Sequence, residues 1–190
     1  CPIFLIRELE NGGKERACTI SGSIKDIPEY IELLDLLQAM TEKDILHLLI
    51  DSPGGYVTTG TAICSLIDIC KGKVITHAIS MCASAGSLIW SAGHECRAGN
   101  YALFMYHMSS HMDFGNSLAI KNNAAHCVDY VIRCLRMSAV KKGHITEEEL
   151  NVLATTQRNV WIDAKTMQER LQSPPIEVTE PTDVEDVPHE

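Results

Sequence analysis

Three short apolar stretches alternate with segments of helical spacing, and this alternation constrains the fold more than any other feature of the sequence. The stretches cover residues 45–50, 73–79 and 102–106, and helical patterns over 59–70 and 87–92 separate them. Stretches of this length with almost no charge are typical of strands buried in a parallel sheet. The order strand, helix, strand, helix, strand predicts an α/β fold built from βαβ units with right-handed crossovers.

The sequence before residue 45 predicts a hairpin and a helix. Asn11-Gly12-Gly13 can adopt the positive φ angles of a tight turn between expected strands at 3–6 and 17–20. Pro28 favours the first turn of a helix, where a proline loses no hydrogen bond. We expect the buried face of this helix to carry apolar residues at helical spacing, namely Ile31, Leu34, Leu37 and Met40.

The sequence after residue 106 predicts three more helices. A long amphipathic pattern over 116–142 ends at Gly143, and glycine is common just after the end of a helix. Thr146-Glu147-Glu148-Glu149 has the spacing of a capping box and predicts the start of a second helix. Asp163 is expected to cap a third helix over 164–171.

The chain of 190 residues has 16 basic and 25 acidic residues, a net charge of −9 that argues against a general nucleic-acid-binding protein. Residues 172–190 hold six of the acidic residues, several prolines and no Lys or Arg. Such a segment cannot bury enough apolar surface to fold. We therefore expect one folded domain over 1–171 and an acidic disordered tail over 172–190, with no nucleic acid among the partners.

The eight cysteines are scattered without a C-x-x-C pair, and several occupy apolar faces, where a thiol behaves as a small hydrophobic group. This usage predicts reduced thiols and a cytoplasmic location, which would be the host cytoplasm for a phage-encoded protein. The sequence begins at Cys1 instead of Met, so we expect a processed or truncated chain. The longest uncharged run, 74–93, is interrupted by His77, Gly86 and four serines, so no membrane-spanning segment is expected.

Two turns of small residues follow the first two apolar stretches, at the edge of the sheet where α/β proteins bind ligands. They are Ser52-Pro53-Gly54-Gly55 and Cys82-Ala83-Ser84-Ala85-Gly86. Gly54-Gly55 before a helix leaves backbone N–H groups free to bind an oxyanion or a phosphate. The glycine spacing of nucleotide-binding loops is missing, which disfavours a nucleotide. Local backbone geometry by itself also explains each turn.

Ser84 and His107 are the candidate reactive side chains. Ser84 stands between two alanines at a strand-to-helix turn, where its hydroxyl is free of bulky neighbours, and His107 follows the third apolar stretch. Either residue alone is more often structural than catalytic. His107 and His111 have the spacing of two metal ligands on a helix, but no third ligand is evident, so we expect neither a metal nor another cofactor.

Taken together, these motifs resemble those of the Clp-type caseinolytic serine peptidases (ClpP). Ser52-Pro53-Gly54-Gly55, Ala83-Ser84-Ala85-Gly86 and Tyr106-His107 occur in the order typical of the family. Glu42-Lys43-Asp44-Ile45 also fits the family pattern, because it leads into the strand before the first turn. The resemblance runs over residues 19–171, which is most of the chain.

The resemblance implies an architecture and a set of partners. The fold would be the ClpP/crotonase-like spiral of βαβ units, with a helical handle at about residues 112–158. The protein would form a homo-oligomeric ring and hydrolyse peptides or unfolded proteins inside it. The family further implies an AAA+ unfoldase as partner, whereas a phage-encoded member could act on capsid or scaffold proteins.

The resemblance also implies roles for individual residues. Ser84 would be the nucleophile and His107 the general base that takes its proton. The backbone N–H groups of Gly55 and Ala85 would form the oxyanion hole. The third triad member of the family is an Asp, and Asn159 occupies the corresponding stretch here. An Asn can orient the histidine through its carbonyl but supplies no negative charge, so we expect slow turnover.

Several alternatives remain open. Asp163 could supply the missing carboxylate, although it is also the expected helix cap. The chain could be a mutant or a weak enzyme, or a catalytically silent structural subunit of the same fold. A crotonase-type acyl-CoA enzyme would share paired backbone oxyanion donors but would not need a Ser–His pair. Cys82 or Cys96 could also act as the nucleophile beside His107 and Asn159.

Overall fold

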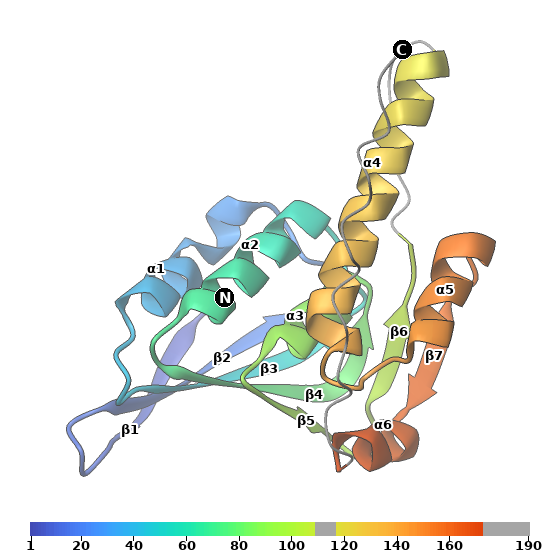
Figure 1. Ribbon diagram of the computed structural model, residues 1–190. Coiled ribbons are helices and arrows are strands. Elements are labelled where there is room, and N and C mark those ends of the chain that lie inside the picture. Colours follow the sequence, from blue (N-terminus) through green and yellow to red (C-terminus); the bar gives the residue numbers. More distant parts are fainter. Residues whose placement is uncertain (109–116, 173–190) are drawn as a thin grey trace.

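The computed structural model describes residues 1–108 and 117–172, with side chains described for 1–108 and 126–172 (Figure 1). A mixed sheet of seven strands runs through this part of the chain in the order β1-β2-β3-β4-β6-β7, and β5 also pairs with β4. Together with the helices around it, this sheet confirms the predicted α/β class. The strands are β1 Ile3–Glu8, β2 Lys14–Ser21, β3 Ile45–Ser52, β4 Lys73–Ala83, β5 Glu95–Ala98, β6 Leu103–Tyr106 and β7 Val160–Asp163.

The centre of the sheet is parallel, as the alternating pattern predicts. β2, β3 and β4 pair in parallel, with Cys18 opposite Leu48 and Leu48 opposite Thr76. Leu46, Leu48 and Ile50 are fully buried, whereas the β3 residues between them are only half-buried. One face of the sheet therefore carries the core, and its carboxyl edge leads into the two small-residue turns.

β1 and β2 form the predicted hairpin at the edge of the sheet. They are antiparallel, and Gly12 in the turn has a φ of +81°. Cys1 and Cys18 form a disulfide, with their Cα atoms 6.5 Å apart, within the usual range. The expectation of eight reduced thiols is therefore wrong for this pair, because the register places Ile3 opposite Cys18 and brings Cys1 within reach. The free thiols are Cys64, Cys70, Cys82, Cys96, Cys127 and Cys134.

Two strands that the sequence analysis did not predict, β5 and β7, complete the sheet. Each has only four residues; two of the four are charged in β5, and only three apolar residues precede Asp163 in β7. Neither forms an apolar stretch long enough to be recognised by its pattern. β4 is also longer than predicted, since it continues to Ala83 and delivers Ser84 directly from a strand.

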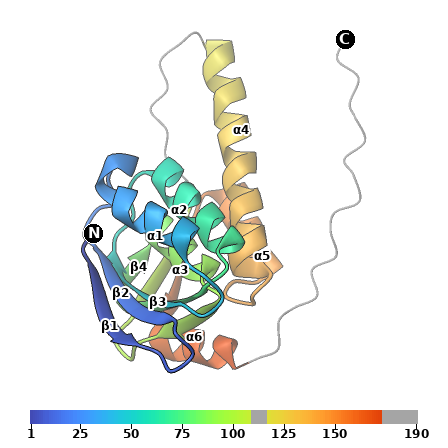
Figure 2. The ribbon, with the colours of Figure 1, turned by 90° about the vertical axis from the view of Figure 1, so that its left-hand side faces the viewer.

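Three helices pack on one face of the sheet (Figure 1, Figure 2). They are α1 Ile31–Ala39, α2 Val57–Ile69 and α3 Ala85–Ala92. Pro28 lies in a 3-10 turn, Ile27–Tyr30, that precedes α1. Leu33 and Leu37 are the buried residues of α1, whereas Ile31 is 50% exposed. The predicted face is thus confirmed at Leu37 and at Met40, which is 3% exposed, and is wrong at Ile31.

The long predicted helix projects from the body of the molecule (Figure 1, Figure 2). α4 covers Ser117–Leu135, continues as a π-helical turn over Arg136–Val140, and is followed by Gly143 with a φ of +73°. Residues 112–116 of the predicted handle and the predicted tail from 173 onward lie outside the described residues. Across the described ranges, no helix has the length and the apolar character needed to cross a membrane.

The last two helices begin at the predicted caps. α5 covers Glu147–Thr156, and Thr146 and Glu149 form the capping box, with each side chain accepting a hydrogen bond from the backbone of the other. α6 covers Ala164–Leu171, and Asp163 accepts the hydrogen bond of its first turn. Both predictions rested on local side-chain chemistry, which acts without regard to the tertiary fold.

A buried polar chain connects α3 to β6. Ser91 Oγ lies 3.1 Å from the Tyr106 hydroxyl and 3.1 Å from His144 Nδ1. Lys142 Nζ donates hydrogen bonds to the Ser91 and Gly93 carbonyl oxygens at the end of α3. His144 is 1% exposed, and burial, helped by the charge of Lys142, lowers its pKa to about 3. The His144 ring is therefore neutral in the folded protein at physiological pH.

This buried histidine makes stability depend on pH. A histidine in the unfolded chain titrates near pH 6.5, whereas the pKa of His144 in the folded chain is about 3. Between these values the unfolded state binds more protons, so the free energy of unfolding falls as the pH is lowered. The contribution of His144 is about 1.4 kcal/mol per pH unit. We expect the His144→Gln variant to lose about this much of the slope between about pH 6 and pH 4 in urea unfolding.

The matched control for this experiment is His126→Gln, since His126 is exposed on α4. The control should keep the wild-type slope. An unchanged slope in His144→Gln would contradict the burial of a neutral imidazole at this position.

Candidate active site

Ser84 lies where β4 ends and α3 begins, in a strained backbone conformation. Its φ and ψ are +56° and −125°, and positive φ values are uncommon for residues other than glycine. The Ser84 N–H donates to the Met105 carbonyl at 2.8 Å, and the Ser84 carbonyl accepts from Leu88 N–H and Ser87 Oγ. Strain of this kind costs on the order of 1–3 kcal/mol and is common at active sites.

The turn at Gly54 lies directly against Ser84. Gly54 has a φ of +102°, and a Cβ atom at this position would overlap the Ser84 Cβ. A Cβ at Gly55 would overlap the backbone of Ile24, with which Gly55 forms an isolated parallel bridge. Glycine is required at both positions because the backbones approach more closely than a side chain permits. The two small-residue turns singled out in the sequence are therefore in contact.

His107 follows β6 and reaches Ser84. Its Nε2 lies 2.6 Å from Ser84 Oγ. The parallel pairing of β4 with β6, in which Ala83 is opposite Met105, brings the two residues together. Partial burial lowers the pKa of His107 below its ordinary value of 6.5, so the ring is neutral at pH 7. A neutral imidazole at this distance can accept the proton of the Ser84 hydroxyl.

Ala85 directly follows Ser84, and Gly55 directly follows Gly54, the residue that packs against Ser84. Ala85 is the first residue of α3, so its N–H has no acceptor within the helix. No hydrogen bond within the described part of the chain uses the Gly55 N–H. The positive end of the α3 dipole adds to the attraction that these donors exert on a negative oxygen.

Asn159 lies next to His107 but is not bonded to it. β6 and β7 are antiparallel, and their last pair is Tyr106 with Val160, so one further step along the ladder places His107 opposite Asn159. Asn159 is exposed, and within the described residues no hydrogen bond joins its side chain to His107. Burial lowers the pKa of His107. Asn159 is therefore near His107 in the sheet register, and among the described residues it makes no hydrogen bond that would orient the ring.

Asp163, the other candidate for this position, lies at the opposite end of β7. It pairs with Leu103, and its carboxylate accepts a hydrogen bond from the Thr166 N–H at 2.7 Å. Hydrogen bonds from Thr166 also lower the pKa of Asp163. In this structure the carboxylate is a helix cap, remote from His107.

The alternative reactive groups are poorly placed. Cys82 Sγ donates to the Gly86 carbonyl at 3.6 Å, Cys96 Sγ donates to the Trp90 carbonyl at 3.2 Å, and burial raises the pKa of both thiols. Buried thiols of raised pKa are weak nucleophiles. Within the described ranges, no group of three or more His, Cys, Asp or Glu side chains could hold a metal ion, and His111 lies outside those ranges.

Sequence reasoning missed the residues that shape the space beside Ser84. A hollow of about 20 Å³ adjoins the Ser84 and His107 side chains. Its apolar walls are Val57, Leu88, Tyr106, Val131, Cys134 and Leu135. These residues belong to α2, α3, β6 and α4, which lie far apart in the sequence. No local pattern reveals them, because only tertiary packing brings them together.

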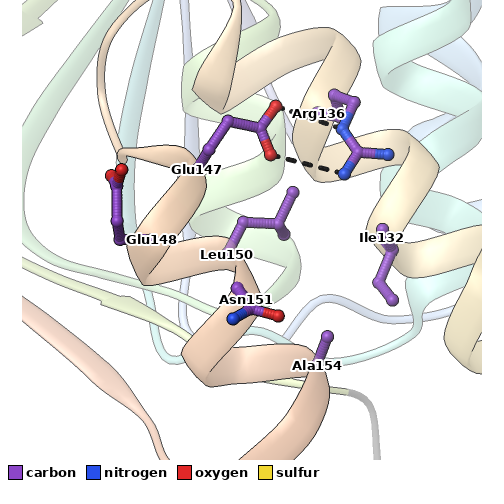
Figure 3. Close-up of a pocket in the computed structure, with 7 residues that line it drawn as sticks. All are labelled: Ile132, Arg136, Glu147, Glu148, Leu150, Asn151 and Ala154. Atoms are coloured by element: carbon purple, nitrogen blue, oxygen red, sulfur yellow. Dashed lines mark hydrogen bonds and ion pairs between the residues drawn. The ribbon is translucent and has the colours of Figure 1, made fainter. Parts of the chain in front are cut away.

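A cavity of about 430 Å³ lies elsewhere, between α5 and the C-terminal end of α4 (Figure 3). The Arg136 guanidinium faces the Glu147 carboxylate across it, with N–O distances of 3.2 and 3.3 Å. None of the residues proposed above for the site lines this cavity. Its principal charged groups neutralise each other, so the chemistry is better supported at Ser84.

Comparisons with known proteins match most of this chain to one family. A protein-family model described as Clp protease matches residues 11–170. The chain is 31% identical over 139 residues to ATP-dependent Clp protease proteolytic subunit 2 of Bifidobacterium longum, which covers 71% of this chain and 67% of the relative. It is 32% identical over 130 residues to ATP-dependent Clp protease proteolytic subunit 3 of Streptomyces avermitilis, which covers 67% of this chain and 58% of the relative. The matched regions thus fall short of the full length of both relatives. The chain belongs to the Clp protease family.

Proposed function

We propose that this chain is a serine endopeptidase in which Ser84 is the nucleophile and His107 the general base. The observation that carries the proposal is the 2.6 Å separation of Ser84 Oγ and His107 Nε2, with Ser84 in a strained turn. A nucleophile and its base within hydrogen-bonding distance form the functional core of such a site. Membership of the Clp protease family supports hydrolysis of peptide bonds as the reaction.

The proposed reaction is acyl transfer in two steps. Ser84 Oγ attacks the peptide carbonyl carbon while His107 Nε2 takes the hydroxyl proton, and the Gly55 and Ala85 N–H groups stabilise the oxyanion. His107 then gives the proton to the leaving amine, which leaves an acyl ester on Ser84. Water, deprotonated by His107, hydrolyses the ester. One such backbone donor is worth about 2.7–4 kcal/mol in the transition state.

A second candidate is a catalytically silent or weak structural subunit of the same fold. The observation that favours it is Asn159, which offers no carboxylate to His107 and makes no hydrogen bond with it within the described residues. A crotonase-type acyl-CoA enzyme is less well supported, because it would leave the close pairing of Ser84 with His107 unexplained.

The proposed substrate is a peptide or unfolded protein, cut inside a homo-oligomeric ring. Phe4, Leu5 and Ile6 are more than half exposed on β1, the edge strand of the sheet, and such an edge supports self-association. The relatives are named as subunits of ATP-dependent proteases, which supports an AAA+ unfoldase as the partner. Capsid or scaffold proteins remain the alternative for a phage-encoded chain.

We propose a cytoplasmic location, which would be the host cytoplasm for a phage-encoded chain. The six free thiols support it, because thiols stay reduced in the cytoplasm. The Cys1–Cys18 disulfide is the observation that stands against it.

Labelling with a fluorophosphonate tests the nucleophile. The proposal predicts a single covalent adduct on the wild-type chain in intact-mass spectrometry, because His107 activates only Ser84. The adduct should be absent in Ser84→Ala and unchanged in Ser80→Ala, whose hydroxyl lies on an exposed part of the same strand. A folded, assembled wild-type chain without an adduct would favour the silent subunit.

Asn159→Asp tests the third position. A carboxylate opposite His107 would orient the ring and stabilise the imidazolium, so we expect peptide turnover to rise by about tenfold or more. Asn151→Asp adds the same charge on the exposed surface of α5 and should leave turnover unchanged. A large loss of turnover in Asn159→Asp would mean that the site depends on the amide.

The same pair of variants gives a pH test. His107 must be neutral to act as base, and its lowered pKa places the acid limb of the kcat/KM profile below pH 6.5 in the wild type. A nearby carboxylate favours the charged ring, so the limb should move to higher pH in Asn159→Asp but not in Asn151→Asp. A limb that stays in place would show that residue 159 does not reach His107.

A further inference from the structure

The hollow beside Ser84 is too small for most side chains. Its volume is about 20 Å³, and its walls are mainly the apolar residues of α2, α3, β6 and α4 named above. A space of this size holds about one water molecule, which is close in size to a methyl group. It lies next to both Ser84 and His107. This is where we expect the side chain that immediately precedes the scissile bond of a bound substrate.

A much larger cavity lies on the other side of the same wall. Its volume is about 300 Å³, and it lies between α2, α3 and α4, with Thr61, Tyr130 and Met137 among its lining residues. Leu88 and Cys134 are the two residues that line both spaces. Their side chains therefore form a partition between the small hollow and the large cavity.

The partition is apolar and well supported. Leu88 is 6% exposed, and its N–H is bonded to the Ser84 carbonyl, so its backbone position is tied to the nucleophile. Burial raises the pKa of Cys134, which keeps the thiol neutral, and a neutral buried thiol packs as a small hydrophobic group. Ser87 Oγ donates to the Ser84 and Met105 carbonyl oxygens and fixes the turn beside the hollow.

We propose that Leu88 and Cys134 determine specificity by restricting the residue on the acyl side of the scissile bond to a small side chain. This inference rests on the proposed peptidase function. The side chain of that residue is attached to the carbon next to the carbonyl that Ser84 attacks, so it must enter the space adjoining Ser84. Gly or Ala fits a hollow of methyl size, whereas Leu or Phe requires the partition to move. Truncating the partition would join the hollow to the cavity behind it.

Two blocked amino-acid p-nitrophenyl esters test this selectivity, one of Ala and one of Leu. Activated esters need little help from the leaving-group proton, so slow peptide turnover does not hide the result. The measured quantity is the ratio of kcat/KM for the Ala ester to that for the Leu ester, after subtraction of the rate with Ser84→Ala. We expect the wild-type chain to favour the Ala ester by about tenfold or more. The Leu side chain is larger by three carbon atoms that the hollow cannot hold, and a misfit of this size lowers kcat/KM by at least that factor.

Leu88→Ala should lower the Ala-to-Leu ratio by about tenfold or more, mainly by speeding the reaction of the Leu ester. Met137→Ala is the matched control, because Met137 lines only the large cavity, is 66% exposed, and should leave the ratio unchanged. Cys134→Ala removes one heavy atom from the same partition. It should also lower the Ala-to-Leu ratio, but by a smaller factor. This milder variant keeps the test decisive if Leu88→Ala fails to fold.

The fluorophosphonate label separates the two proposals. A chain that takes the label and hydrolyses the Ala and Leu esters equally well, or whose ratio is the same in Leu88→Ala and Met137→Ala, would overturn the specificity inference alone. A folded wild-type chain that takes no label and hydrolyses neither ester would overturn the peptidase function itself.

Discussion

One backbone hydrogen bond, from the Ser84 N–H to the Met105 carbonyl, sets the distance on which the candidate site depends. It joins the end of β4 to β6 two residues before His107, so the nucleophile and its base are positioned by sheet pairing instead of by their own flexible side chains. The positive φ of Ser84 is tolerated because the same turn is held by the Ser84 carbonyl and closed against Gly54. The strain at this residue is thus maintained by the parallel sheet and by the glycine of the neighbouring turn.

The sequence predicts the parts of the fold that depend on local chemistry. The central parallel strands, the hairpin, the capping box at Thr146 and the cap at Asp163 all follow from spacing and residue type. β5 and β7 were missed because each has only four residues, too few to form a recognisable apolar pattern, and two of the four in β5 are charged. The Cys1–Cys18 disulfide was missed because it depends on strand register, which composition does not reveal.

The residues of the candidate site also fall into two groups, those that local sequence patterns point to and those that only tertiary packing brings together. Ser84, His107, Gly55 and Ala85 could be singled out because they lie in turns that directly follow strands, where the order along the chain reveals proximity. Leu88 and Cys134 could not, because 46 positions separate them and only the packing of α4 on α3 makes them neighbours. Asn159 is an intermediate case: the family pattern suggested its position, but its exposure, and the lack of a hydrogen bond to His107 among the described residues, are properties of the folded chain.

α3 connects two regions that lie far apart in the sequence, the turn at Ser84 and the base of the projecting helix α4. Its first residue follows the nucleophile, and carbonyl groups at its far end accept hydrogen bonds from Lys142, just after the π-helical turn at the base of α4. α3 has eight residues and is about 12 Å long, so little more than two helical turns separate the nucleophile from this end. The base of the projecting helix and the nucleophile are therefore attached to the two ends of one short helix. A partner bound to the projecting helix would therefore pull on the same short helix that begins directly after Ser84.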